Sequence, residues 1–252
     1  MLKKERLRYI CEKVNNKGVI TVNEIIQDLD VSDMTVRRDL DELEKASKLL
    51  RIHGGAQSLT YSLDYEMSHI EKSTVQVHEK QKIALYASTL IQEGETIYLG
   101  PGTTIQILAT MLREKKVRVI TNSYHVFEIL MNAEQAEVIL IGGEYRNHTG
   151  TFVGPITNND LSLLKFSKAF ISCNGIYNNA ITTYSLEEGE VQKIALNNSR
   201  HKYLLADSKK FSREDFYTYY NLHDFDKVIT DEDISPDVLQ HYEQYTEIII
   251  GH

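Results

Sequence analysis

Apolar residues recur with a helical period through the first part of the chain. The spacing i, i+3, i+4, i+7 predicts an amphipathic helix that ends near Gly18. Thr21 and Ser32 are suited to cap two further helices, the first of them short. This order of helix, short helix, tight turn and helix is typical of a helix-turn-helix. The apolar positions of the three helices are Leu7, Ile10, Cys11 and Val14, then Ile25, Ile26 and Leu29, then Val36, Leu40 and Leu43.

The third predicted helix has a basic and hydroxylated exposed face. Met34 and Arg38 point directly away from its apolar stripe when each residue advances about 100°. Thr35 and Arg37 lie on the two flanks. A recognition helix presents such side chains to the major groove, where arginine reads guanine edges or grips phosphate. The alternative is a solvated helix whose two arginines pair with the acidic residues one turn later.

A short alternating segment with a glycine pair follows the third helix. Leu50 and Ile52 alternate with Arg51 and His53, and Gly54–Gly55 permits a sharp turn. The pattern predicts a β-wing with Arg51 and His53 on its outer side. Taken alone, His53 would more often be an ordinary surface histidine, but beside a basic helix the wing interpretation is favoured.

From Glu79 onward, apolar strands alternate with amphipathic helices. Short runs rich in Ile, Val and Leu, separated by helices, indicate a parallel sheet that is covered on both faces and has right-handed crossovers. Ligands of such α/β domains bind beyond the carboxyl ends of the strands. The predicted strands are Thr96–Leu99, Arg118–Ile120, Val138–Ile141, Ala169–Ser172, Tyr203–Ala206, Lys227–Ile229 and Glu247–Ile250.

Glycines and hydroxyl side chains follow the first three of these strands. Glycine lets the backbone approach a ligand, and free N–H groups with hydroxyls at a helix start favour an anion such as phosphate. Serine and threonine are also ordinary helix caps, so a purely structural role for each loop is the alternative. The candidate phosphate-binding residues are Gly102, Thr103, Thr104, Thr121, Asn122, Ser123, Gly142 and Gly143.

Two later positions add charge to this predicted site. Lys193, within a predicted helix, is a candidate charge partner for a phosphate, and Asp207 in Ala206–Lys210 is suited to bind sugar hydroxyls. Both are also compatible with solvated surface charges, and for Lys193 alone that interpretation is favoured.

The charge of the chain is unevenly divided. Its net charge of −8 argues against a protein that coats nucleic acid. Residues 1–58, however, hold 11 Lys+Arg against 10 Asp+Glu, whereas residues 59–252 hold 17 against 26. We therefore expect a DNA-binding domain at 1–58, a linker at 59–77 and an acidic α/β domain, which carries the candidate phosphate-binding loops, at 78–252. The nearly neutral first domain predicts modest nonspecific affinity for DNA.

Composition excludes several other classes. The chain is 42% hydrophobic and 25% charged, which suits a packed core. No apolar run reaches the roughly 20 residues of a membrane helix, and the start lacks the apolar stretch of a signal peptide, so we expect a cytoplasmic protein. Cys11 and Cys173 lie too far apart in sequence for a zinc knuckle or a disulfide scaffold. No metal or cofactor is expected.

These motifs resemble the signature of the DeoR family of bacterial repressors over nearly the whole chain. The resemblance implies a winged helix-turn-helix that binds operator DNA, with Thr35, Arg37 and Arg38 on the recognition helix. It also implies a sensor domain that is similar in fold to ribose-5-phosphate isomerase. In the family this domain binds a phosphorylated sugar as inducer, and the resemblance implies that Lys210 belongs to the binding site. The motifs are Arg6, Ile10, Val14, Ser32–Leu40 and His53–Ala56, then Glu95–Ile97, Gly102–Thr104, Val119–Ser123, Leu140–Arg146, Lys193, Leu204–Ser208 and Lys210–Phe211.

Two positions depart from the family pattern. Most members have aspartate where this chain has Gly100 and Asn174, and the loss of both carboxylates weakens any case for isomerase chemistry. Other segments resemble the family members that repress operons for lactose and galactose use, for which the implied inducer is tagatose 6-phosphate. Those segments are Gly100–Thr104, Ser32–Thr35, Gly142–Arg146, Ala195–Asn198 and Tyr219–Leu222.

The leading hypothesis is a non-enzymatic repressor whose operator binding responds to a sugar phosphate. A homo-oligomer, dimer or tetramer, is expected, because operators read by helix-turn-helix proteins are matched by two-fold symmetry. The alternative is a sugar-phosphate isomerase-like enzyme with an appended DNA-binding module. An interaction scaffold ranks last, since it has no use for three anion-suited loops.

Overall fold

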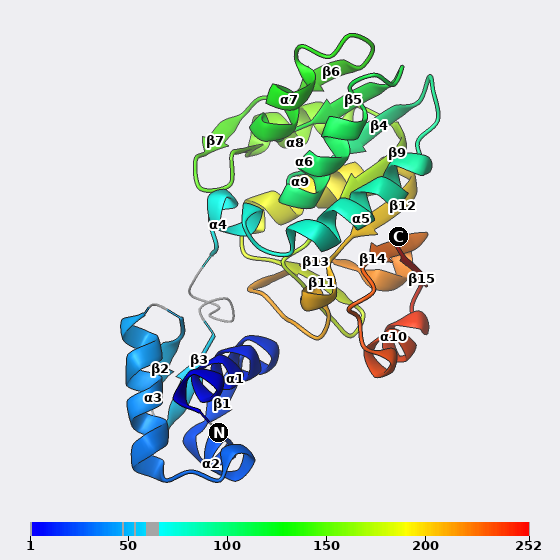
Figure 1. The fold of residues 1–252 in the computed structure, drawn as a ribbon. Coiled ribbons are helices and arrows are strands. Elements are labelled where there is room, and N and C mark those ends of the chain that lie inside the picture. Colours follow the sequence, from blue (N-terminus) through cyan, green and yellow to red (C-terminus); the bar gives the residue numbers. More distant parts are fainter. Residues whose placement is uncertain (1, 47, 53, 59–65, 252) are drawn as a thin grey trace. The chain divides into compact units, whose positions relative to one another are not determined.

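The computed structural model divides the chain into two compact units, Met1–Met67 and Ser68–His252 (Figure 1). It describes residues 2–46, 48–52, 54–58 and 66–251. Each unit has its own hydrophobic core. No helix within the described ranges is both long and apolar enough to cross a bilayer.

The first unit is a winged helix-turn-helix, as the sequence predicts. Thr21 caps the second helix by accepting a hydrogen bond from Glu24 N (3.2 Å), and Ser32 caps the third by accepting one from Thr35 N (3.3 Å). One strand, β1, was not predicted; it pairs with the far strand of the wing in the order β1-β3-β2. The elements are α1 (Lys3–Lys17), β1 (Val19–Thr21), α2 (Val22–Leu29), α3 (Asp33–Lys45), β2 (Leu50–Ile52) and β3 (Gly55–Gln57).

The apolar stripes of the three helices meet in one core. Ile10, Ile25, Val36 and Leu40 are fully buried there, because their helical spacing places them on the inward faces. Cys11 packs against the rim of this core as a small apolar residue.

The second unit is built on a seven-stranded parallel sheet that contains all seven predicted strands. Two strands, β9 and β12, begin earlier than predicted, because polar residues such as Lys168 interrupt their apolar runs. Lys168 Nζ is held by Leu90 O (2.6 Å) and by the Glu95 carboxylate (2.7 Å). The order is β15-β14-β12-β9-β4-β5-β6. The strands are β4 (Thr96–Leu99), β5 (Arg118–Thr121), β6 (Glu137–Leu140), β9 (Phe166–Ile171), β12 (Ser199–Leu205), β14 (Lys227–Thr230) and β15 (Glu247–Ile250).

Helices cover both faces of this sheet (Figure 1). Along β4, Ile97 and Leu99 pack on one face, whereas Tyr98 packs on the other, as alternate positions of a strand must. The first face carries α5 (Val77–Thr89), α6 (Thr103–Met111) and α7 (Tyr124–Leu130), and the second carries α8 (Pro155–Ser162), α9 (Leu186–Asn197) and α10 (Pro236–Glu243).

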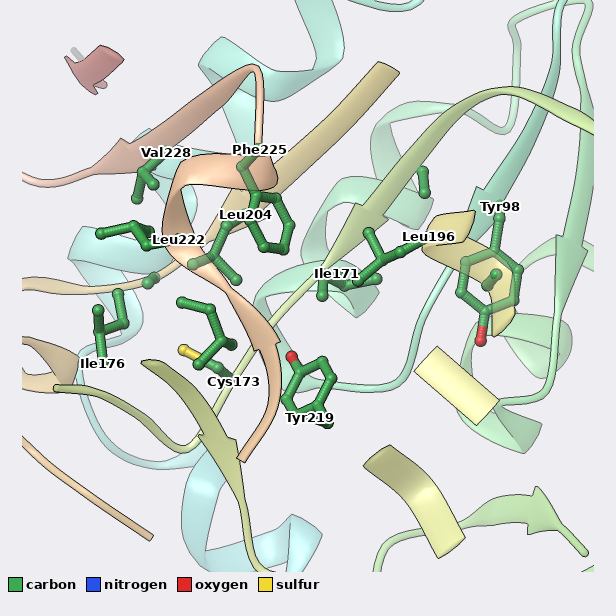
Figure 2. Close-up of a cluster of buried hydrophobic side chains, with 14 of the residues drawn as sticks. Tyr98, Ile171, Cys173, Ile176, Leu196, Leu204, Tyr219, Leu222, Phe225 and Val228 are labelled. Carbon is green, nitrogen blue, oxygen red and sulfur yellow. The ribbon is translucent and has the colours of Figure 1, made fainter. Parts of the chain in front are cut away.

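Two smaller antiparallel sheets were not predicted. One has the order β10-β11-β13 and packs on the second face, where Cys173 and Tyr219 lie in the buried cluster drawn in Figure 2. The other is the hairpin β7–β8. Their strands are short and carry polar residues, so they lack the apolar runs of the main sheet. They are β7 (Glu144–Arg146), β8 (Thr151–Val153), β10 (Gly175–Tyr177), β11 (Ala180–Thr183) and β13 (Tyr217–Asn221).

A short helix, α4 (His69–Ser73), opens the second unit. The sequence analysis placed residues 59–77 in a linker. In the structure, residues 68–77 lie in the second unit, and α4 is anchored to it by the hydrogen bond from His69 N to His148 O (3.1 Å).

Candidate functional site

Side chains in the first two turns of α3 are exposed to solvent on the face that points away from the core. Met34 is 62% exposed and Arg38 is also exposed. Arg37 forms two hydrogen bonds with the Asp33 carboxylate (2.5 and 3.2 Å), one turn earlier. Among the described residues, neither arginine pairs with Asp41 or Glu42, and Arg38 forms no ion pair. The guanidinium of Arg38 is thus available to a nucleic acid.

A buried ion pair holds α3 against α1. The carboxylate of Asp39, only 2% exposed, accepts two hydrogen bonds from the Arg6 guanidinium, one of them 3.0 Å from Nη2 to Oδ1. Asp39 directly follows Arg38, so this pair fixes the rotation of α3 and with it the direction of the exposed face. Both residues belong to the family pattern, but their pairing was not predicted.

The wing contributes less free charge than the sequence suggests. Arg51 is turned toward α3, where its Nε lies 3.6 Å from Asp41 Oδ1, and its backbone N–H donates to Glu44 Oε1 (3.0 Å). Gly54 lies in the turn of the wing. His53, the other predicted wing residue, lies outside the described residues.

Four candidate loops lie at the same edge of the parallel sheet. The first follows β4, where Thr103 and Thr104 begin α6 and are largely buried. Gly102 precedes them with a φ of 133°, and a Cβ at this position would lie 3.1 Å from Ser172 Cβ in the neighbouring β9 loop. Glycine is therefore required where these two loops approach each other.

The second loop, after β5, uses its polar side chains to hold itself in place. Asn122 accepts a hydrogen bond from Tyr98 Oη (2.8 Å) and donates one to Phe152 O (2.8 Å). Thr121 Oγ1 accepts from Ser123 N (3.0 Å), and Ser123 caps α7. Burial, with a smaller effect of nearby Glu188, raises the pKa of Tyr98 and keeps its hydroxyl a donor. All three loop residues are buried and serve the loop itself.

The third loop, after β6, is packed against α8. Thr157 Oγ1 donates a hydrogen bond to Gly142 O (2.8 Å). A Cβ on Gly143 would lie only 2.1 Å from Thr157 Oγ1, so glycine is needed there. Gly142 and Gly143 are thus accounted for by packing at the edge of the sheet, two strands away from β4.

The fourth loop, after β12, carries the charged residues of the site. Asp207 is 3% exposed and caps the short 3₁₀ helix Ser208–Lys210 by accepting from Lys209 N (3.2 Å). Lys210 lies at the end of that helix. Lys193 lies on the exposed side of α9, with its Nζ 4.0 Å from a carboxylate oxygen of Glu190.

Two further lysines, Lys80 and Lys72, lie near enough to this loop to interact with its charges, and neither was predicted as a site residue. Lys80 is buried on α5, and its Nζ donates to Lys72 O (2.6 Å) and Val75 O (2.7 Å). Burial lowers the pKa of Lys80 to about 8; Asp207 opposes this shift, and Lys210 and Lys72 add to it. A signal was present in the sequence, since Lys80 shares the stripe i, i+3, i+4, i+7 with three buried apolar residues, Ile83, Ala84 and Ala87.

A second buried charge, Glu188, likewise lies among the buried residues of its helix, α9. Its carboxylate accepts hydrogen bonds from Thr151 Oγ1 (2.8 Å), Thr149 Oγ1 and Arg146 Nη1 (3.3 Å). These bonds join α9 to the β7–β8 hairpin. Within the described ranges, no group of histidine, cysteine, aspartate and glutamate side chains is arranged to hold a metal ion.

A winged helix-turn-helix with an exposed arginine, joined to a parallel-sheet domain with a charged loop edge, defines a DNA-binding regulator with a sensor domain. Residues 6–61 match the family described as DeoR-like helix-turn-helix domain, and residues 75–232 match the DeoR C terminal sensor domain. The chain belongs to the DeoR family.

Curated relatives match over almost the full length. The lactose phosphotransferase system repressor of Lactococcus lactis subsp. lactis is 48% identical over 252 residues, which cover 99% of this chain and 99% of the relative. The repressor of the same name from Streptococcus mutans serotype c is 47% identical over 251 residues, covering 99% and 100%. Both relatives are named as repressors and not as enzymes.

Solved structures are more distant. Ribose 5-phosphate isomerase A from Methanocaldococcus jannaschii has a TM-score of 0.39 and 18% sequence identity, and the match covers 52% of this chain and 53% of that chain.

Proposed function

We propose that the protein represses an operon for lactose or galactose use and leaves its operator when a phosphorylated sugar, tagatose 6-phosphate, binds to the second unit. The observation that supports operator binding is the free Arg38 guanidinium on α3, a helix whose rotation is fixed by the ion pair of Arg6 and Asp39. The relatives that are nearly half identical to this chain are named as repressors of the lactose phosphotransferase system, which supports the choice of operon.

The proposed DNA contacts come from the first turns of α3 and from the wing. Arg38 is the side chain best placed to reach a base edge or a phosphate. Arg37 and Arg51 must first exchange their carboxylate partners for DNA, which weakens their contribution. The proposed residues are Ser32, Met34, Thr35, Arg37, Arg38, Arg51, His53 and Gly54.

The proposed sugar-phosphate site lies at the carboxyl edge of the parallel sheet. Backbone N–H groups at the start of α6, with Thr103 and Thr104, are suited to the phosphate, and Asp207 is suited to the sugar hydroxyls. The loops are shaped by Thr121, Asn122, Ser123, Gly142 and Gly143, and Lys210 and Lys193 are the proposed charge partners of the phosphate. Lys193 must first exchange Glu190, whose carboxylate lies 4.0 Å from its Nζ, for the ligand.

The experiment is an operator-binding titration with the full chain. Fluorescence anisotropy with a labelled fragment of the lactose-operon promoter gives the affinity, and added tagatose 6-phosphate is expected to release the fragment. Binding should weaken steeply as salt rises, because lysine and arginine displace counterions from phosphates. If the affinity for the operator changes neither with salt nor in Arg38→Ala, the proposed DNA-binding function is overturned. If only another sugar phosphate releases the operator, the choice of tagatose 6-phosphate as inducer is overturned.

The same samples test the enzyme alternative. Incubation of the full chain with aldose and ketose phosphates should give no turnover, while the bound sugar raises the unfolding temperature by mass action. Turnover would instead favour the isomerase-like alternative. Sedimentation with a two-fold symmetric operator fragment tests the proposed dimer or tetramer.

A further inference from the structure

The segment of residues 68–76, called here the α4 segment, is the first part of the second unit after the chain leaves the DNA-binding unit. It consists of α4 and the turn before α5. Its start is held by the His69 ring, which stacks on the His125 ring at a centroid distance of 3.9 Å. The same ring bonds Gln106 Oε1 through Nε2 (2.8 Å). Gln106 belongs to α6, the helix that begins at the Thr103–Thr104 loop.

Lys72, in the middle of the α4 segment, reaches the loop after the central strand β9. Its Nζ donates to Asn174 Oδ1 (3.1 Å), and Asn174 Nδ2 donates to Asp215 Oδ2 (2.8 Å). Asn174 follows β9, which lies between β4 and β12 in the sheet. The α4 segment is therefore anchored to the same loop edge as the proposed sugar-phosphate site.

Positive charge gathers where the α4 segment meets this edge. Lys80 Nζ closes the end of the segment by binding the carbonyl oxygens of Lys72 and Val75. The Lys72 and Lys210 ammonium groups are near enough to affect the ionisation of Lys80 and of Cys173, which precedes Asn174. The carboxylates of Asp207, Asp215 and Glu79 oppose this charge. Like charges held together disfavour the docked segment, and an anion between them would remove that cost.

We propose that the α4 segment forms one wall of the sugar-phosphate site, with Lys72 binding the phosphate, so that the ligand favours the docked segment over an undocked one. This inference rests on the proposed function and adds to it the route by which the ligand acts on the DNA-binding unit. A ligand shifts an equilibrium only if it prefers one state. Here the preference arises because only the docked segment brings the Lys72 ammonium to the loops. The chain continues from this segment directly into the DNA-binding unit.

The test is hydrogen–deuterium exchange of the full chain with and without tagatose 6-phosphate, with inorganic phosphate as a second probe. In the native protein, tagatose 6-phosphate is expected to slow exchange both at residues 102–106 and in the α4 segment. Lys72→Met should abolish the ligand-dependent slowing in the α4 segment and weaken the binding of the sugar phosphate by about tenfold or more. Lys72→Arg, which keeps the charge, should restore both.

Two control variants separate the ligand role from a merely structural one. Asn174→Ala removes the hydrogen bond seen in this structure but leaves the Lys72 ammonium in place. It should speed exchange of the α4 segment without ligand and still allow the ligand to slow it. Lys116→Met removes an exposed lysine from the opposite edge of the sheet and should behave as the native protein does.

The outcomes distinguish this inference from the function on which it rests. Slowed exchange at residues 102–106 without any change in the α4 segment would leave the sugar-phosphate site standing and overturn the role of Lys72. A Lys72→Met variant that binds and responds as the native protein does would do the same. If neither probe binds and the operator is not released, the sugar-phosphate function itself fails, and this inference fails with it.

Discussion

The two candidate sites use their polar side chains in opposite ways. On α3, the side chains proposed to meet DNA point outward, and one buried ion pair behind them fixes their direction. At the sheet edge, the side chains of Thr121, Asn122 and Ser123 are buried and satisfied within the protein. The proposed DNA-binding surface therefore combines the free guanidinium of Arg38 with arginines that hold carboxylate partners, Arg37 with Asp33 and Arg51 with Asp41, on a fixed support. The polar side chains of the sensor loops hold the loops themselves, and two nearby lysines, Lys72 and Lys80, donate hydrogen bonds within the protein.

The largest expected effect comes from breaking the support of α3. Asp39→Ala leaves the Arg6 guanidinium without its carboxylate in a largely buried place and should cost about 3 to 5 kcal/mol. That cost is a large share of the stability of so small a unit. Urea unfolding followed by circular dichroism, together with operator binding, measures it. Lys45→Ala, which removes an exposed charge from the same helix, is the control, and equal unfolding midpoints for the two variants would refute the role of the pair.

The next effect should come from the sensor loops. Asn122→Ala leaves the Tyr98 hydroxyl and the Phe152 carbonyl unpaired in the interior and should destabilise the second unit by about 2 kcal/mol. A thermal unfolding scan of the full chain reports it, with the exposed Asn132→Ala as control. A variant that keeps native stability and loses only ligand affinity would mean that Asn122 contacts the ligand, which would erase the contrast between the two sites.

A free recognition side chain should instead affect binding without affecting folding. Arg38→Ala is expected to weaken operator binding by on the order of tenfold at unchanged unfolding temperature, and to lower the salt dependence by about one counterion if the contact is to phosphate. Arg8→Ala, an exposed arginine on α1, serves as the control. Loss of stability in Arg38→Ala would show that the side chain supports the fold.

The smallest effect should be a pH dependence from Lys80. Its pKa is about 8 in the folded protein, below the ordinary value of 10.5, so the unfolded chain binds more protons between these two values. Stability should therefore rise with pH through this window relative to Lys80→Met. Unfolding temperatures of both proteins at pH 7, 8, 9 and 10 give the difference, with Lys116→Met as a surface reference. Parallel curves would mean that Lys80 is not desolvated.

Periodicity was enough to predict which residues face each core. It placed Ile10, Val36 and Leu40 in the first unit and all seven strands of the main sheet. It could not identify hydrogen-bond partners that come together only on folding. Asn122 is bound to residues 24 and 30 positions away in sequence, and Lys72 to a residue 102 positions away. The strand β1 was missed because three residues between two helices are too few to show alternation.

A charged residue within a buried helical stripe is a sequence signal for a buried hydrogen-bonded charge, and it was not used in the predictions. Lys80 and Glu188 both lie at helical positions whose neighbours are buried, and each turned out to hold separate segments together. A lysine or glutamate at such a position is costly unless it is paired, so its presence indicates a partner even when the partner is unknown.

The burial of Cys173 has a practical consequence for chemical labelling. Burial raises the pKa of its thiol to about 12, and burial also raises the pKa of the Cys11 thiol. Since the thiolate is the reactive form, alkylating dyes and mild oxidants should leave Cys173 untouched in the folded protein, whereas Cys11 is only partly buried. Replacing Cys11 alone would then let a single cysteine introduced on an exposed turn accept a fluorophore selectively.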